Sequence, residues 1–412
     1  MAKKSERNII TGLDIGTSKV VALVGEVSPD GSIEIIGIGR HPSRGLKRGV
    51  VVDIEATVNS IQRAVHEAEL MAGCEVRTVY TGIAGSHIRS LNSHGIVAIR
   101  DKEVTQYDIE RVIDAAKAVV IPADQKILHI LPQEFIIDNQ GSIREPVGMA
   151  GVRLESRVHI VTGAVSAAQN ITKCVRRCGL EVNDIILEQL ASSHAVLTED
   201  EKELGVCLID IGGGTTDIAV FLEGAIQHTA VIPIAGDQVT NDIAVALRTP
   251  SKAAEAIKLS YGSAIPDFAN SSQMLEVLSV NERPGRKISA KVLSDVVSAR
   301  YEELFTLVRN ELRRSGFEDL IAAGIVLTGG ASNVRGAIEL AELCFEMPVR
   351  HGCAQQISGL NEASSNSSLA TGVGLLLHGF QQQYDGGYNM PVLKDNDDGV
   401  WSRMKSWFQG NF

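Results

Sequence analysis

One short pattern occurs twice in this chain and limits its possible folds more than any other feature. Leu13-Asp14-Ile15-Gly16-Thr17 recurs, with two extra glycines, as Ile209-Asp210-Ile211-Gly212-Gly213-Gly214-Thr215. Each copy follows a short apolar strand and leads directly into a second strand, and 196 positions separate Asp14 from Asp210. So wide a spacing is not that of a solenoid repeat, and it indicates a duplicated half-molecule.

The bulk properties fit such a molecule. The chain has 412 residues, 44% of them hydrophobic, which is enough for at least two packed domains. Its net charge of -11 argues against general binding to nucleic acid. Asp14 interrupts the first apolar run, and no run of about 18 apolar residues occurs, so we expect neither a secretory signal nor a membrane span. The six cysteines are scattered and indicate reduced structural thiols rather than a zinc site.

The repeated turns can bind an anion. Glycine permits positive φ and close approach to a ligand, and successive backbone N–H groups in a tight turn form a site for phosphate. Asp14 and Asp210 would hold Mg²⁺ beside it, directly or through water, because this cation prefers oxygen ligands. One such turn could be an ordinary hairpin, but two matched copies favour a polyphosphate clamp. The other common phosphate motifs are absent, since Gly37-Ile38-Gly39 lacks the third glycine of a dinucleotide fingerprint.

Several further donors lie in or beside the two turns. The predicted phosphate-binding residues are Gly16, Thr17, Ser18, Lys19, Gly212, Gly213, Gly214, Thr215 and Thr216. Farther along, the strand Gly324–Thr328 runs into Gly329 and Gly330, a turn that lets the backbone lie flat against a base or ribose. Asn333 is expected to cap the helix that follows, from Val334 to Cys344.

The order of these three turns resembles the superfamily of actin, the sugar kinases and the heat-shock chaperones. The resemblance implies an α/β fold with duplicated actin-like (RNase H-like) domains around a nucleotide cleft, and ATP with Mg²⁺ as the ligand. It implies nucleoside contacts from Gly236, Glu255 and Lys258, beside Gly329, Gly330 and Asn333. It also implies a connecting helix at 187–193, where Glu188 is the candidate for orienting the attacking water.

Within that superfamily nearly the whole chain resembles the FtsA family of bacterial cell-division proteins. An inserted α+β module with the segments 131–135 and 145–154, the second phosphate turn at 205–220, and an acidic linker with an amphipathic tail carry the resemblance. It implies this division: 1–83 as subdomain IA, 84–158 as the inserted subdomain IC, 159–195 as IA continued, 196–233 as IIA, 234–302 as IIB, 303–380 as IIA continued, 381–399 as a flexible linker and 400–412 as a membrane-targeting helix.

The tail has a helical apolar face. At 100° per residue, six side chains fall within about 140° of one another, and these are Val400, Trp401, Met404, Trp407, Phe408 and Phe412. Both tryptophans of the chain are among them, with Arg403 and Lys405 nearby. Tryptophan beside basic residues is typical of a helix that lies in the membrane interface. The alternative is a helix that docks on the protein's own core, which the long polar linker disfavours.

The FtsA resemblance implies partners as well. It implies that the C-terminal peptide of FtsZ binds subdomain IIB, that the chain assembles with itself head to tail, and that it helps to recruit later division proteins. A basic strip of Arg286, Lys287, Lys291 and Arg300 could grip an acidic peptide, or it could be a solvated surface. The expected location is the cytoplasmic face of the inner membrane at the septum, where the tail would bind anionic lipid.

Two rival functions remain open from the sequence. A small-molecule kinase of the same superfamily would need a substrate-binding insert with a catalytic Asp near the cleft, which the chain does not display. A relative of the type IV pilus assembly ATPases would not be expected to carry this inserted module and this tail. ATP hydrolysis is left open by the resemblance, because FtsA-like proteins can be slow or inactive ATPases.

Overall fold

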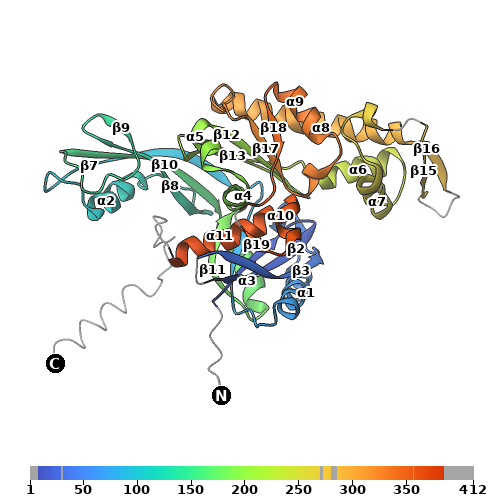
Figure 1. Ribbon diagram of the computed structural model, residues 1–412, viewed down its shortest axis with the longest axis horizontal. Helices are drawn as coiled ribbons and strands as arrows, with labels where there is room; N and C mark the ends of the chain where they lie inside the picture. The colour runs from blue at the N-terminus through green and yellow to red at the C-terminus, as the bar shows by residue number, and fades with distance from the viewer. Residues whose placement is uncertain (1–7, 29–30, 270–271, 280–284, 356, 385–412) are drawn as a thin grey trace, which may run out of the picture.

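The computed structural model describes residues 8–28, 31–269, 272–279, 285–355 and 357–384. Two β-sheets lie one above the other in Figure 1, and helices α4 (Glu188–Val196) and α11 (Ala370–Tyr384) lie between them. A small sheet with one helix projects at one end of the upper half, and a mainly helical region projects at the other. No helix among the residues placed in the structure is long and apolar enough to cross a bilayer.

The first sheet has the strand order β11-β6-β1-β2-β3-β19. β1 pairs antiparallel with β2, β2 pairs antiparallel with β3, and β6 and β11 add parallel strands on the other side. Its interior is fully apolar from Val20 to Val24, as expected for a strand covered on both faces. The strands are β1 (Ile9–Ile15), β2 (Lys19–Val27), β3 (Ile33–Pro42), β6 (Thr78–Ile83), β11 (Glu181–Leu187) and β19 (Ser358–Gly359).

The second sheet repeats this connectivity. Its order is β14-β13-β12-β17-β18, with three antiparallel strands followed by two parallel ones. The order β3-β2-β1-β6-β11 of the first sheet follows the same plan, so the duplication predicted from the repeated turn is confirmed. The strands are β12 (Val206–Ile211), β13 (Thr216–Leu222), β14 (Ala225–Ile232), β17 (Ile325–Thr328) and β18 (Val349–His351).

Helix α1 (Ile54–Ala72) shows how local sequence sets the element boundaries. Asp53 accepts a hydrogen bond from the Ala56 N–H at 3.0 Å and caps the start, a contact worth about 1 kcal/mol. Gly73 ends the helix in the left-handed conformation, with φ 65°. The other helices of the two halves are α3 (Val165–Arg177), α5 (Glu199–Leu204), α9 (Ala337–Phe345) and α10 (Asn361–Ser365), with 3₁₀ turns at Gly330–Asn333 and Ser367–Leu369.

The helical projection is built on the second half. It contains α6 (Gly236–Ala246), α7 (Ser251–Tyr261), the 3₁₀ turn Pro266–Phe268, the hairpin of β15 (Met274–Val277) and β16 (Arg286–Ser289), and α8 (Ala290–Ser315). In α8 the side chains of Tyr301 and Phe305 are fully buried, and Phe305 packs on Phe345 of α9 with ring centroids 5.5 Å apart. This long helix therefore connects the projection to the core of the second half.

The inserted module has its own sheet and core. Its order is β7-β10-β8-β9, formed by β7 (Arg89–Ala98), β8 (Gln125–Ile137), β9 (Gln140–Ile143) and β10 (Arg153–Ala164), and α2 (Gln106–Ala116) packs on it. The apolar run 158–165 of the sequence predicts a buried strand. It is the C-terminal part of β10, which runs unbroken from Arg153 to Ala164 and pairs with β7 and β8, so this strand belongs to the sheet of the module.

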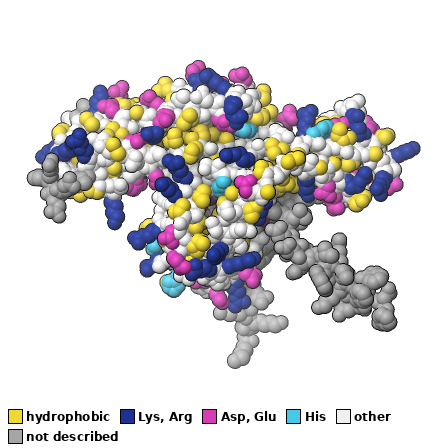
Figure 2. All heavy atoms as spheres, turned by 180° about the vertical axis from the view of Figure 1, so that it is seen from behind, with side chains coloured by type: hydrophobic (Ala, Val, Ile, Leu, Met, Phe, Trp, Pro, Cys, Tyr) yellow, Lys and Arg dark blue, Asp and Glu magenta, His cyan; other side chains and the backbone are white. Residues whose placement is uncertain are grey.

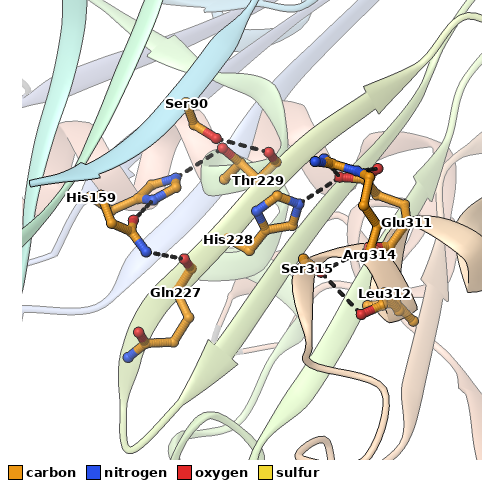
Figure 3. Close-up of polar contacts among 10 residues, drawn as sticks. Ser90, His159, Gln227, His228, Thr229, Glu311, Leu312, Arg314 and Ser315 are labelled. Carbon is orange, nitrogen blue, oxygen red and sulfur yellow. Dashed lines mark hydrogen bonds and ion pairs between the residues drawn. The ribbon is translucent and has the colours of Figure 1, made fainter.

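The module also contacts the second half through β14, the edge strand of the five-stranded sheet (Figure 3). Ser90 donates to the Thr229 carbonyl at 3.0 Å, and Asn92 donates to the Gln227 carbonyl at 3.3 Å. Buried His159 joins them, since its ring nitrogens lie 2.7 Å from the Asn92 Oδ1 and 3.0 Å from the Thr229 Oγ1. Burial lowers the pKa of His159 to about 3, so the ring is neutral. It donates to the Asn92 oxygen and accepts from the Thr229 hydroxyl.

Two predicted segments at the C-terminus, the linker and the tail, extend past Tyr384, the last described residue. The sequence also predicts a last helix at 369–380, which is α11 in the structure and continues to Tyr384, four residues into the predicted linker. The rest of that linker and all six residues of the predicted membrane face, Val400, Trp401, Met404, Trp407, Phe408 and Phe412, lie outside the described residues.

Candidate functional site

The two repeated turns have the same backbone geometry. In the first, the Gly16 N–H donates to the Lys19 carbonyl at 3.0 Å, and in the second the Gly212 N–H donates to the Thr215 carbonyl at the same distance. Thr17, Ser18, Gly213 and Gly214 form the tips. Among the described residues their backbone N–H groups have no protein acceptor, as an anion-binding turn requires.

The turns face each other across a cavity of about 280 Å³. Gly213 of the second turn lies so close to the first that an added Cβ would come within 2.8 Å of the Ser18 Cβ. The predicted residues that line the cavity are Asp14, Gly16, Thr17, Ser18, Lys19, Glu188, Asp210, Gly212, Gly213, Gly214, Thr215, Gly236, Glu255, Lys258 and Gly330. The fold therefore brings together residues from both halves of the chain.

Three predicted ligand residues do not line this cavity. Thr216 is buried and its hydroxyl donates to the Ile234 carbonyl at 2.7 Å, so it is not directed at a phosphate. Gly329 lies behind the site, where a Cβ would come within 2.3 Å of the Asp210 Oδ1. Asn333 lines an adjoining hollow of about 320 Å³, which shares Lys258 and Gly330 with the first cavity.

The expected capping role of Asn333 is wrong. The following helix, α9, begins only at Ala337, and its N-cap is Gly336 with φ 80°. The Asn333 amide instead donates to the Ser367 Oγ at 2.8 Å and to the Gly330 carbonyl at 3.3 Å. Its side chain therefore ties the glycine turn to the segment that precedes α11.

Four carboxyl groups gather at the cavity, and those of Asp14, Asp210 and Asp217 are buried. Burial is the main cause that raises the pKa of each, to about 6 for Asp14 and about 8 for Asp217, with Asp210 and Glu188 raised as well. For Asp14 the Lys19 ammonium opposes this effect, and the charge of Asp210 adds to it. The site is therefore deficient in positive charge.

Asp217 is the functional candidate that sequence reasoning missed. It lies directly opposite Asp210 in the β12–β13 pair, and the Thr215 hydroxyl donates to its Oδ2 at 2.8 Å. Its Oδ1 is buried and has no hydrogen-bond partner in the part of the chain that the structure describes. The signal was its place at the end of the second turn, two residues after Thr215. Ser368 and Thr371 were also missed: Lys19 donates to the Ser368 carbonyl at 2.7 Å, and Thr371 donates to Asp210 at 3.2 Å.

The other end of the cavity is held in place by polar contacts. The Lys258 ammonium lies 3.0 Å from the Gly236 carbonyl, 2.8 Å from the Thr240 hydroxyl and 2.7 Å from the Glu255 carboxylate. Tyr301 of α8 donates to the Ala331 carbonyl at 2.6 Å and fixes the glycine turn. These contacts give the site a preformed wall beside Gly236 and Gly330.

The predicted basic strip is divided in the structure. Arg286 and Lys287 are exposed on β16, Lys291 is exposed in the first turn of α8, and Figure 2 shows basic side chains gathered at the end of the molecule that carries β15 and β16. Arg300 lies farther along α8, with its Nε 2.6 Å from the Asp242 Oδ2 and a second ion pair to Glu303. Its charge is therefore already paired.

Within the described chain, no group of three or more His, Cys, Asp or Glu side chains is arranged to hold a metal by itself. The four carboxyl groups nevertheless fit a hydrated cation, because they line one cavity and burial raises the pKa of each, which a cation bound among them would oppose. Oxygen ligands with retained water are the usual environment of Mg²⁺.

Comparison with known proteins identifies the family. A model described as "Cell division protein FtsA" matches residues 207–374, and one described as "SHS2 domain inserted in FTSA" matches residues 85–162. The chain is 63% identical to the cell division protein FtsA of Pseudomonas aeruginosa over the full length of both. The chain belongs to the FtsA family. It is also 45% identical to the FtsA protein of Escherichia coli K12, again over both full lengths.

Solved structures agree on the fold. The PilM–PilN type IV pilus biogenesis complex includes a chain with a TM-score of 0.65 at 16% identity, covering 90% of this chain and 98% of that one. MreB5 of Spiroplasma citri bound to ADP has a TM-score of 0.56 at 16% identity, covering 92% and 99%. At such identities the likeness concerns the fold alone. It confirms for this member of the FtsA family the predicted actin-like α/β architecture, with the SHS2 module inserted.

Proposed function

We propose that this protein binds ATP with Mg²⁺ in the cleft between its halves. The observation that carries the proposal is the pair of matched turns, whose unpartnered N–H groups face one cavity beside Asp14 and Asp210. Thr17, Ser18, Lys19 and Thr215 add donors for phosphate, while Gly236, Glu255, Lys258 and Gly330 lie where the nucleoside would be held. The ADP-bound MreB5 structure, which has the same fold, supports this reading.

Mg²⁺, when bound, would neutralise charge on both the phosphates and the carboxyl groups. Asp14 and Asp210 are the proposed ligands, through water, because both are buried and line the cavity between the turns. Glu188 is the candidate for orienting an attacking water. Burial and the neighbouring carboxylates raise the pKa of Glu188 well above its usual value, and a carboxyl group that resists ionisation is a poor base. We therefore propose weak or no ATPase activity.

Replacing Asp210 with alanine tests the site. Asp210→Ala should weaken Mg-ATP binding at least tenfold, about 1.4 kcal/mol in isothermal calorimetry, because the cation loses one of its two carboxylate anchors. Asp200→Ala removes an equal charge from the exposed surface of α5 and should leave binding unchanged. Equal affinities for Asp210→Ala and the wild type would show that the second turn does not hold the nucleotide.

We further propose that the protein anchors the FtsZ ring to the cytoplasmic face of the inner membrane at the septum. Membership of the cell-division FtsA family and the amphipathic tail predicted at 400–412 support this. On the same grounds it would self-assemble head to tail and help to recruit later division proteins. The nucleotide would then regulate assembly, with contacts to partners and anionic lipid performing the main function.

The FtsZ peptide has a suitable groove between α6 and α8. Its apolar floor includes Val245, Val296 and Ala299, and Arg300 lies on its wall. An acidic peptide that also carries apolar side chains could bury those side chains on this floor. One of its carboxylates would then replace Asp242 or Glu303 as the partner of the Arg300 guanidinium. Arg286, Lys287 and Lys291, on the same projection, would attract it over a longer range.

Charge reversal at Arg300 distinguishes a peptide-binding groove from a solvated surface. Arg300→Glu should weaken binding of the acidic C-terminal FtsZ peptide about tenfold or more, measured by fluorescence anisotropy. Mg-ATP affinity should stay the same. Lys252→Glu, on the exposed face of α7, makes the same charge change outside the groove and is the matched control. If both variants bind the peptide like the wild type, the groove is not its site.

A further inference from the structure

A small hairpin beside the phosphate cavity has no role in the function proposed so far. It consists of β4 (Leu46–Lys47) and β5 (Val50–Val51), joined by the two-residue turn Arg48-Gly49. Both turn residues have positive φ, 51° and 75°, as a type I′ turn requires. Arginine at the first of these positions is unusual, and its strain must be compensated by the surroundings.

The base of this hairpin is fixed to helix α1. The Gly45 carbonyl accepts from the N–H groups of Val52 and Asp53 at 2.8 and 3.1 Å, and Asp53 caps the helix. An added Cβ at Gly45 would come within 2.3 Å of the Asp53 carbonyl oxygen, so the chain is tightly closed here. The turn is therefore held on a rigid support.

The tip of the hairpin contacts the first phosphate turn. The Gly49 N–H donates to the Thr17 Oγ1 at 2.9 Å, and the Ser43 N–H donates to the Ser18 carbonyl at 3.0 Å. Because the Thr17 oxygen accepts from Gly49, its own proton is left to be donated elsewhere. Both Thr17 and Gly49 line the cavity, so this hydroxyl is positioned to donate to a phosphate oxygen.

The same tip contacts the second phosphate turn. An added Cβ at Gly214 would lie 2.6 Å from the Thr17 Oγ1 and 2.9 Å from the Arg48 Cα. Thr17, Gly214 and the Arg48-Gly49 turn therefore meet at one point. Any change in the separation of the two turns must move Gly214 relative to the tip.

On its far side the tip packs on the first residues of the inserted module. A Cβ at Gly49 would lie 3.0 Å from the Ala84 carbonyl group and from the Gly85 nitrogen, and one at Gly85 would lie 3.3 Å from the Arg48 carbonyl oxygen. The match to the SHS2 model begins at residue 85. These are contacts of backbone with backbone, which cannot be relieved by rotating a side chain.

We propose that the Arg48-Gly49 turn is a sensor of the terminal phosphate of the nucleotide, and that it passes the position of the two phosphate turns to the inserted module. This inference rests on the proposed nucleotide site. A terminal phosphate held between Thr17 and Gly214 would draw the two turns together around the tip. When it is absent, the Thr17 hydroxyl and Gly214 relax, and the tip shifts against Ala84 and Gly85.

The test compares two glycine substitutions with the same backbone cost. Gly49→Ala places a methyl group against the module, whereas Gly73→Ala places one at φ 65° with nothing within 4 Å. Isothermal calorimetry would measure the affinities of both variants for Mg-ATP and for Mg-ADP. Gly49→Ala should weaken the binding of Mg-ATP about fivefold or more and that of Mg-ADP less than about twofold. Gly73→Ala should change neither affinity. An equal loss for the two nucleotides would overturn the proposal.

Hydrogen exchange of residues 84–98 provides the second readout. In the wild type Mg-ATP should protect this segment more than Mg-ADP does, and in Gly49→Ala the difference should vanish. Thr17→Val, which removes the acceptor for the Gly49 N–H without disturbing the module, should remove the difference too. Thermal unfolding of each variant establishes that it is folded. An ATP-dependent difference that persists in both variants would overturn the coupling.

The two proposals fail separately. If the wild type binds no ATP, the nucleotide site itself is wrong. If it binds both nucleotides with no difference in exchange at residues 84–98, the site stands and the sensor is wrong.

Discussion

Vesicles rich in anionic lipid should retain the wild-type protein and lose the Trp407→Glu variant. Burying a large apolar side chain contributes roughly 1.5–3 kcal/mol, so partial insertion of Trp401, Met404, Trp407, Phe408 and Phe412 gives several kcal/mol. Arg403 and Lys405 add about 1 kcal/mol each at an anionic surface. A glutamate in place of Trp407 removes one such contribution from the apolar face and must itself be dehydrated. Co-sedimentation at fixed lipid concentration measures the loss.

Two controls make this result specific. Ser406→Glu makes the same charge change on the polar face of the predicted helix and should reduce binding much less. High salt should weaken binding only in part, because the apolar contribution is not screened. A truncation after Gly399 that still co-sediments as well as the full chain would refute the membrane tether. Mg-ATP affinity, measured on the same variants, should not change.

Asp217→Asn should stabilise the nucleotide-free protein by several kcal/mol at pH 8 to 9. Burial raises the pKa of Asp217 from 3.8 to about 8, so the folded state keeps a proton that the unfolded state releases. The free energy of unfolding then falls as the pH rises from about 4, and the loss is complete above about pH 8. Asparagine cannot ionise and escapes this cost. The gain should therefore grow with pH between 4 and 8.

Denaturant unfolding at pH 4 and pH 8.5 measures this difference. At pH 4 the wild-type carboxyl is protonated and the two proteins should be nearly equal in stability. Saturating Mg-ATP should also narrow the gap at pH 8.5, because the bound cation supplies the missing positive charge. A gain that is the same at both pH values would show that the effect comes from packing rather than ionisation. A substitution that removes a charge and thereby stabilises the fold is typical of functional sites.

The sequence was most informative where local chemistry determines structure. The two Asp-Ile-Gly turns predicted the duplicated halves. Most of the residues predicted around them line the cavity. The apolar periodicity of 54–72 predicts helix α1 with the bounds that the structure has, because a capping residue and a terminating glycine frame it. The helix that the sequence predicts at 251–261 is α7, which Pro250 precedes. In these segments each local preference agrees with the tertiary structure.

Other parts depend on contacts that a single sequence does not display. Strand β14 was missed because Gln227, His228 and Thr229 interrupt its apolar pattern. In the structure Thr229 is buried and the other two are only partly exposed, since the module and α8 cover them. His228, for instance, bonds Glu311 of α8 at 2.8 Å, as Figure 3 shows. Alternation of polar and apolar residues cannot reveal such partners. The same holds for Gly49 and Asp217, whose roles arise from residues distant in the chain.

The docking of the inserted module on β14 has a mechanical consequence. The chain joins the module to the first half at two points, and the module contacts the second half through side chains that donate to carbonyl groups of β14. The two halves alone could rotate about the hinge between them. The module bridges both halves, closes this linkage and restrains that rotation. At the β14 junction this linkage is held by side-chain hydrogen bonds instead of covalent chain, and each such bond contributes only about 0.5–1.5 kcal/mol. Opening of the cleft should therefore begin there, and the stiffness of the molecule would be set at a place remote from the nucleotide.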